Sequence, residues 1–260
     1  MNTPLHIIAD SNIWGAQQAF SALAGFDVRL DILEHQHITA KRVQDADILL
    51  VRSSTKVNPA LLADSQVRFV GTATIGDDHV DTTYLQQRNI HFSSAAGSST
   101  ESVVEYMLAA FFQLEQLGYM DFSQDCLGII GVGRIGGLLN QACAKLGVTT
   151  LLNDPPRQVE SRQAESHDTQ SGSTTPFQSL NTLLQQADIL TLHTPLVQGK
   201  SAAEDTLHLL NAEQISQFKG KGIINAGRGA CLDNQALLAW LEQDVGRFAV
   251  LDCWEDEPNI

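Results

Sequence analysis

A glycine-rich turn in the middle of the chain has the spacing of a dinucleotide-binding site. The segment GVGRIG supplies Gly131, Gly133 and Gly136, between a short apolar run and an amphipathic stretch that ends near Gly147. The first glycine permits a tight turn, the second lets the backbone approach a pyrophosphate, and the third allows close helix–strand packing. The N–H groups at the start of the following helix are unpaired and can bind phosphate.

An acidic residue stands where such a site needs one. Asp154 follows the next apolar run, at close to the spacing of about 20 residues that is typical of dinucleotide-binding folds. Its carboxylate can accept hydrogen bonds from both hydroxyls of an adenosine ribose, and it would repel a 2′-phosphate. The pattern therefore predicts NAD rather than NADP as the cofactor.

Two further segments place charged residues directly after apolar runs. Arg228 lies between two glycines in NAGRGA, and Asp252 and Glu257 follow the run at 248–251. Ligands of open parallel sheets bind at the carboxyl ends of the strands. We therefore expect Arg228 to contact a substrate carboxylate or carbonyl rather than to be a surface arginine in a turn. The acidic pair either tunes an acid/base residue beside Arg228 or forms a solvated loop.

Short apolar runs alternate with helical periodicity and define the elements that must position these residues. The runs lie at 5–9, 48–51, 68–71, 127–130, 150–152, 189–192, 223–225 and 248–251. Nearly uninterrupted apolar strands that alternate with helices predict parallel sheets covered on both faces. The expected fold class is therefore α/β.

A domain boundary is expected before a long helix. Ser98 precedes Glu101 at the spacing of a capping box, and apolar positions from Val103 to Leu114 continue a buried helix. The expected organisation is a substrate domain over 1–97, a connecting helix over 98–120 and a dinucleotide-binding domain over 121–260.

Composition limits the partners. The chain has 260 residues, of which 43% are hydrophobic, and a net charge of −14. This negative charge argues against nucleic acid or an anionic membrane as a partner. The four cysteines show no Cys-x-x-Cys spacing, and three of them lie in apolar contexts. We interpret those three as packing residues rather than metal ligands or a disulfide framework. No apolar run is long enough for a membrane span, and we expect a cytoplasmic protein. The polar stretch 158–176 is expected to be a solvated loop.

Several segments resemble the D-2-hydroxyacid dehydrogenase family. They are LGIIGVGRIG, NDPPR, LTLHTPL, TLHLLN, INAGRGACLDNQALL and LDCWEDEP, and the likeness extends over nearly the whole chain. The resemblance implies two Rossmann-like or flavodoxin-like parallel-sheet domains joined by a long helix. It also implies hydride transfer between NAD and a small 2-hydroxy acid, and VRSSTKVN and FVGTATIGDDHVD indicate a phosphorylated one.

The resemblance also implies roles for individual residues. Arg228 would bind the substrate carboxylate and polarise the reacting centre, and Glu257 would keep a catalytic histidine protonated. Ser53 and Thr74 match substrate-binding positions, and we add Arg52 because a phosphate needs a cationic site. Besides the three glycines, the implied NAD contacts are Arg134, Ile135, Asp154, Thr194, Ala226, Gly227, Arg228 and Asp252.

Two departures from the family pattern leave alternatives open. The family's general acid/base is a histidine beyond the glutamate, whereas every histidine here precedes Glu257. We therefore expect a C-terminally truncated chain, with an incomplete second domain and without the dimerisation region of a full-length homodimer. Residues 94–100, SAAGSST, also differ from the family. The alternatives are a dehydrogenase of another D-2-hydroxy acid, such as 3-phosphoglycerate, and a catalytically silent NAD-binding module.

Overall fold

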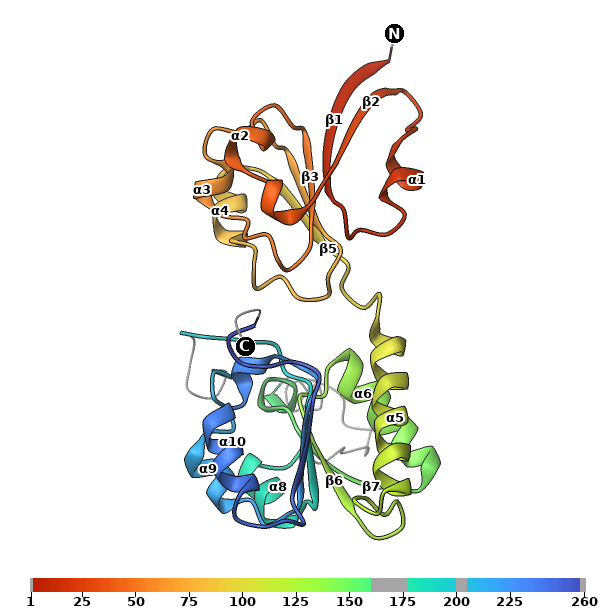
Figure 1. Cartoon of the computed structure of the whole chain (residues 1–260), viewed down its shortest axis with the longest axis vertical. Coiled ribbons are helices and arrows are strands. Elements are labelled where there is room, and N and C mark those ends of the chain that lie inside the picture. Colours follow the sequence, from red (N-terminus) through yellow and green to blue (C-terminus); the bar gives the residue numbers. More distant parts are fainter. Residues whose placement is uncertain (1, 160–176, 200–204, 258–260) are drawn as a thin grey trace, which may run out of the picture. The chain divides into compact units, whose positions relative to one another are not determined.

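The computed structural model forms two compact units, Met1–Ser99 and Thr100–Ile260 (Figure 1). It describes residues 2–159, 177–199 and 205–257, so the loop expected at 158–176 lies almost wholly outside the described residues. Within those ranges, no helix combines the length and the apolar character that crossing a membrane requires.

The first unit is a parallel five-stranded sheet in the order β2-β1-β3-β4-β5. Figure 1 shows α2, α3 and α4 on one face of the sheet and α1 on the other. The strands are β1 (Thr3–Asp10), β2 (Phe26–Leu33), β3 (Ile48–Val51), β4 (Phe69–Thr72) and β5 (His91–Ser94). The helices are α1 (Ala16–Phe20), α2 (Ala40–Val43), α3 (Pro59–Leu62) and α4 (Thr82–Gln87), with a 3-10 turn η1 (His35–His37).

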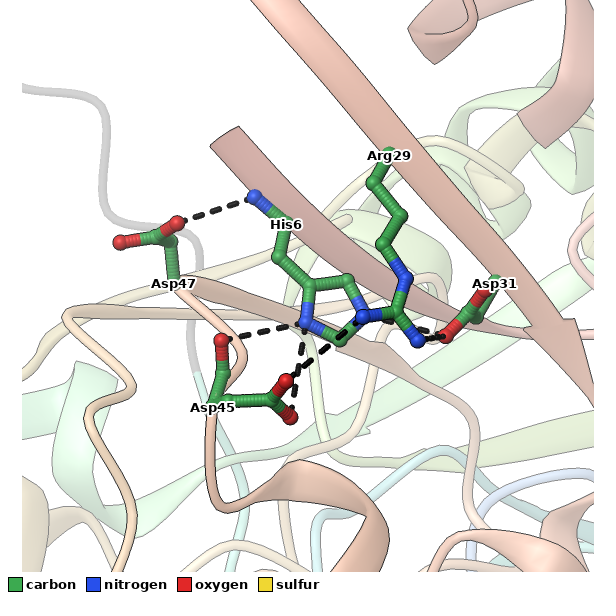
Figure 2. A network of polar contacts seen from close by, with 5 residues as sticks. All are labelled: His6, Arg29, Asp31, Asp45 and Asp47. Atoms are coloured by element: carbon green, nitrogen blue, oxygen red, sulfur yellow. Dashed lines mark hydrogen bonds and ion pairs between the residues drawn. The ribbon is translucent and has the colours of Figure 1, made fainter. Parts of the chain in front are cut away.

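A buried histidine joins β1 to its neighbours in this unit (Figure 2). The His6 Nε2 atom lies 3.0 Å from Asp31 Oδ2, its Nδ1 lies 3.1 Å from the Asp45 carbonyl oxygen, and its backbone N–H donates to Asp47. Burial by itself raises the pKa of the Asp31 carboxyl. The hydrogen bond from His6 and the charge of Arg29 outweigh burial, so the pKa of Asp31 lies below its usual value of 3.8.

The second unit is also a parallel five-stranded sheet, in the order β10-β9-β8-β6-β7. In Figure 1, α5 and α6 cover one face and α8, α9 and α10 the other. The strands are β6 (Cys126–Ile130), β7 (Thr149–Asn153), β8 (Ile189–Leu192), β9 (Gly222–Asn225) and β10 (Phe248–Leu251). The helices are α5 (Thr100–Gln116), α6 (Arg134–Leu146), α8 (Leu180–Gln186), α9 (Ala212–Gln217) and α10 (Asn234–Leu241), with a 3-10 turn η2 (Gly229–Cys231).

The predicted α/β class with two parallel sheets is confirmed, and each predicted apolar run is a strand. Two strands, β2 and β5, were not predicted. Both are edge strands of the first sheet with partly exposed side chains, so their sequences mix polar and apolar residues instead of forming an apolar run. The long helix α5 begins at Thr100 and groups with the second unit.

Candidate cofactor and active site

The glycine-rich turn between β6 and α6 is tight at its two ends and open in its middle. Gly131 has a left-handed backbone with φ 87°, and a Cβ atom there would lie 2.9 Å from the carbonyl of His193. A Cβ atom on Gly136 would overlap the carbonyl oxygen of Gly131, so α6 packs over the turn only without a side chain. Among the described residues, no atom lies within 4 Å of a Cβ position at Gly133. The turn is therefore accessible to a ligand at Gly133.

A cavity of about 430 Å³ opens at the carboxyl ends of β6, β7 and β8. Gly131 comes to it from the end of β6, Asp154 from the end of β7 and Thr194 from the end of β8. Strand β6 lies between β7 and β8, so the chain connects β6 to β7 on one side and then crosses over to β8 on the other side. Such a switch point is where open α/β sheets bind their ligands, and the cavity is large enough for part of a dinucleotide.

The Asp154 carboxylate is hydrogen-bonded to the glycine-rich turn beside the cavity. Its Oδ2 atom accepts a hydrogen bond of 2.8 Å from the backbone N–H of Val132, and its Oδ1 accepts one of 3.1 Å from the N–H of Arg157. The Arg157 Nε atom lies 3.8 Å from Oδ2. The glycine-rich turn thus holds in place the carboxylate that is expected to bind the ribose of the same cofactor.

Thr194 presents a polar atom that needs a partner. Its Oγ1 atom is buried without a hydrogen bond among the described residues, and Thr194 lines the cavity. Leaving such an atom unsatisfied costs about 1 to 3 kcal/mol, which a bound ligand can relieve. The open position at Gly133, the hydroxyl of Thr194 and the carboxylate of Asp154 together fit a dinucleotide.

The neighbouring His193 is buried and uncharged. Its Nε2 atom lies 3.0 Å from the Thr191 hydroxyl, and its Nδ1 has no hydrogen bond in the described part of the chain. Burial lowers the pKa of His193 from 6.5 to about 4, because the charged imidazolium loses its hydration. His193 is therefore a neutral packing residue at physiological pH.

The turn that carries Arg228 is wrapped around Asn225. The buried Asn225 side chain accepts a hydrogen bond from the N–H of Gly227 and donates one of 3.0 Å to the carbonyl of Arg228. A Cβ atom on Gly227 would lie 2.9 Å from the Thr194 carbonyl oxygen, and one on Gly229 would overlap the backbone of Trp254. These glycines let the turn pack closely against other backbone.

The acidic turn after β10 lies beside Arg228. The N–H of Asp252 donates to Asn225, and the Glu257 carboxylate accepts a hydrogen bond of 2.8 Å from the N–H of Trp254. Burial, the charges of Asp252 and Glu257, and the proximity of Cys231 raise the pKa of the Cys253 thiol to about 12, although the charge of Arg228 opposes them. The charges of the predicted Arg228, Asp252 and Glu257 therefore all act on the Cys253 thiol.

A contact that no sequence pattern indicated fastens this acidic turn. His208 forms a short hydrogen bond with Glu255, whose second carboxylate oxygen accepts one from the N–H of Asn234 at the start of α10. The His208 N–H donates to the carbonyl of Ala230, next to the Arg228 turn. The segment TLHLLN contained His208, but no local pattern pairs it with a glutamate far along the chain.

In the first unit, Arg52 and Ser53 follow β3 and are both exposed. The Arg52 Nη1 atom donates a hydrogen bond of 3.2 Å to the carbonyl oxygen of Asn12, which follows β1. The guanidinium thus links the ends of the adjacent strands β1 and β3. This hydrogen bond uses one of its five N–H donors.

Thr74 follows β4 and takes part in a chain of hydroxyl contacts. It donates a hydrogen bond of 2.8 Å to the Gly76 carbonyl oxygen, so its hydroxyl must accept from Thr72, 2.7 Å away. Thr72 must then accept from the Nε2 atom of His79 at 3.0 Å. The Thr74 hydroxyl thus donates its one proton within its own loop, so it can only accept a hydrogen bond from a ligand.

The second unit matches a known family. A model of the NAD binding domain of D-isomer specific 2-hydroxyacid dehydrogenases matches residues 105–260. The chain belongs to this family. The predicted family and the predicted cofactor, NAD, are thereby confirmed.

Curated relatives extend the similarity to the first unit. The erythronate-4-phosphate dehydrogenase of Proteus mirabilis is 41% identical over 257 residues, and that of Chromohalobacter salexigens is 42% identical over 258 residues. Each alignment includes 98% of this chain, which spans 64% and 63% of the lengths of these two relatives.

Solved structures agree with the fold. D-lactate dehydrogenase of Aquifex aeolicus, complexed with NAD and lactic acid, has a TM-score of 0.75 at 24% identity, over 96% of this chain and 78% of that one. The NAD⁺-bound 3-phosphoglycerate dehydrogenase of Entamoeba histolytica has a TM-score of 0.76 at 18% identity, over 99% of this chain and 83% of that one.

Proposed function

We propose that the protein containing this chain oxidises 4-phospho-D-erythronate to 3-hydroxy-2-oxo-4-phosphobutanoate with NAD. The observation that carries the proposal is the identity of about 41% to erythronate-4-phosphate dehydrogenases, which covers 98% of the chain. This similarity includes residues before 105, outside the match to the NAD-binding family. NAD-binding domains serve many substrates, so the likeness of the first unit is what favours this one.

The second unit supplies the groups proposed to bind NAD. Backbone N–H groups of Gly133, Arg134 and Ile135 open helix α6 and would bind the pyrophosphate, as helix N-termini do. Gly131 and Gly136 shape the turn. The remaining proposed contacts are the Asp154 carboxylate for the ribose, the Thr194 hydroxyl, the backbone of Ala226, Gly227 and Arg228, and Asp252.

Arg228 is proposed to anchor the substrate. NAD held at the glycine-rich turn would supply the hydride acceptor. The C2–H bond of the hydroxy acid breaks with its electron pair, the hydroxyl proton passes to a base, and the C2–O bond becomes a carbonyl. The Arg228 guanidinium would hold the carboxylate through two parallel N–H donors and polarise the C2 oxygen.

Glu257 is proposed to assist the base. A carboxylate beside a histidine favours the charged imidazolium and raises the pKa of the histidine, which suits a general acid/base. The hydrogen bond from the Trp254 N–H holds the Glu257 carboxylate in one orientation. In the first unit, Arg52, Ser53 and the Thr74 loop are proposed to bind the rest of the substrate, with Arg52 on its phosphate.

Turnover in the complete protein tests the proposal. We expect NADH formation from 4-phospho-D-erythronate with a kcat/KM at least about tenfold above those for D-erythronate and 3-phosphoglycerate, because a phosphate site left empty loses charge-assisted hydrogen bonds. A preference for 3-phosphoglycerate would instead support the alternative substrate. NAD binding without turnover of any hydroxy acid would identify a silent NAD-binding module.

Arg228→Lys tests the anchor. We expect kcat/KM to fall about 100-fold while NAD affinity changes less than about threefold, because a lysine cannot form the two-pronged contact with a carboxylate. Arg42→Lys, an exposed position on α2, is the matched control and should leave both values unchanged. Near-normal kcat/KM in Arg228→Lys would show that the anchor is another residue.

We further propose that the reaction belongs to pyridoxal 5′-phosphate biosynthesis and that the complete protein is a cytoplasmic homodimer. A strain that lacks the gene should then need added pyridoxine for growth. Light scattering on the complete protein should give twice the mass of one chain, and a monomer mass would contradict the assembly.

A further inference from the structure

The cavity beside the glycine-rich turn is lined by two carboxylates from separate segments. Asp154 follows β7, and Asp205 lies in the loop between β8 and α9. No lysine, arginine or histidine is among the described residues that line it. We propose that Asp205 is a second determinant of cofactor choice, which acts with Asp154 to exclude the 2′-phosphate of NADP. The proposal rests on the assignment of this cavity to the adenosine half of NAD.

The loop that carries Asp205 is fastened to the wall of the cavity. The Thr206 hydroxyl donates a hydrogen bond of 2.7 Å to the Pro195 carbonyl oxygen and accepts one of 2.7 Å from the N–H of Val197. The Thr206 N–H donates to the Val197 carbonyl oxygen at 2.9 Å. The Asp205 Oδ1 atom accepts a hydrogen bond of 3.0 Å from the N–H of Leu207. The carboxylate of Asp205 is therefore held at the cavity without any ligand.

A second carboxylate matters because the charge of Asp154 is partly compensated. Asp154 accepts two backbone N–H hydrogen bonds, and the Arg157 Nε atom lies 3.8 Å from it. Asp205 forms no ion pair within the described part of the chain. A doubly charged phosphate bound in this cavity would therefore experience the charge of Asp205 with less compensation than that of Asp154. In a partly buried cavity, this repulsion weakens binding by a factor of about three to ten.

Binding titrations of the chain itself test the proposal. We expect Asp205→Asn to tighten NADPH binding about three- to tenfold and to change NADH binding less than about twofold, as followed by nucleotide fluorescence. Asp154→Asn should have the larger effect, and the double variant should combine both. The gain for NADPH should shrink at about 0.5 M salt, because the cavity is open to solvent and the repulsion is screened.

Glu242→Gln is the matched control, since it removes one negative charge at the exposed end of α10, near the opposite edge of the sheet. An NADPH-to-NADH preference in Asp205→Asn equal to that of Glu242→Gln would overturn the proposal. Equal weakening of both nucleotides would overturn it too, because Asp205 would then contact the nucleoside that they share. Failure of the unaltered chain to bind NADH would refute the assignment of the cavity. These titrations need no turnover, so they are independent of the proposed substrate.

Discussion

The two sheets of this chain share one strand order and use their switch points differently. Counted in chain order within each unit, both read 2-1-3-4-5. In the second unit the switch point beside Gly131 opens into the cavity of about 430 Å³. In the first unit the equivalent point lies between the ends of β1 and β3, where Arg52 hydrogen-bonds the Asn12 carbonyl oxygen. Topology provides a place for a ligand, and the residues at the strand ends decide how that place is filled.

The two units also differ in the polar partners of their buried histidines. His6 of the first unit has oxygen partners at both ring nitrogens, including the carboxylate of Asp31. His193 of the second unit has the Thr191 hydroxyl at one nitrogen and no partner among the described residues at the other, and its pKa falls to about 4. Burial beside carboxylates and burial among uncharged groups thus give one residue type different polar partners.

Among the changes that test this comparison of the two units, a side chain added to the glycine-rich turn should have the largest effect on stability. Gly136→Ala places a Cβ atom against the Gly131 carbonyl oxygen, so α6 must move, and we expect the free energy of unfolding to fall by about 3 kcal/mol. Gly133→Ala is the matched control because no atom of the described part of the chain lies within 4 Å of its Cβ position. That variant should keep its stability and lose NADH affinity. Urea unfolding and NADH titration measure the two quantities, and equal stability of both variants would contradict this account of the turn.

Removing the buried histidine of the second unit should have an intermediate effect on stability. The effect should appear as a change in how stability depends on pH. The pKa of His193 is lowered from 6.5 to about 4 in the folded chain, so the unfolded chain binds a proton first as the pH falls. Its contribution to stability is present above pH 6.5 and is lost toward pH 4, by about 2 kcal/mol between pH 7 and pH 5.

His193→Gln should remove this part of the pH dependence, which urea unfolding at the two pH values would show. His37→Gln, at an exposed position of the first unit, should retain it. A parallel pH dependence of His193→Gln and the unaltered chain would mean that His193 is not buried as a neutral imidazole.

Weakening the network around His6 should have the smallest effect. Asp31→Asn removes a carboxylate that accepts from His6 and Arg29, and we expect a loss of about 1 kcal/mol, since the site is partly exposed and solvent screens it. The pKa of Asp31 lies below 3.8 in the folded chain. Its stabilisation is therefore present above pH 3.8 and is lost as the pH falls through the lower folded pKa.

Asp27→Asn, an exposed residue on the same strand β2, is the control and should leave stability at neutral pH unchanged. Hydrogen exchange of the β1 and β2 amides would localise the loss to the first unit. If both variants exchanged alike, the network would be a surface feature without a role in joining the strands.

Local patterns in the sequence were sufficient for the central strands and for the glycine-rich turn. Strands such as β3 and β8 are buried on both faces, so their residues form recognisable apolar runs. The spacing of Gly131, Gly133 and Gly136 follows from a turn and a helix that are adjacent in the chain. The edge strand β2 could not be recognised in this way, because the charged residues Asp27, Arg29 and Asp31 interrupt its apolar residues.

Tertiary structure alone decided which distant residues complete each site. Gly227 and Gly229 are glycines because Thr194 and Trp254 lie against them, and the contact of His208 with Glu255 joins segments 47 residues apart. Asp205 lines the cavity beside the glycine-rich turn because Thr206 fastens its loop to Pro195. Neighbouring residues in the sequence determine periodicity, caps and turns, whereas such contacts depend on where the sheet brings its strand ends together, which no short segment encodes.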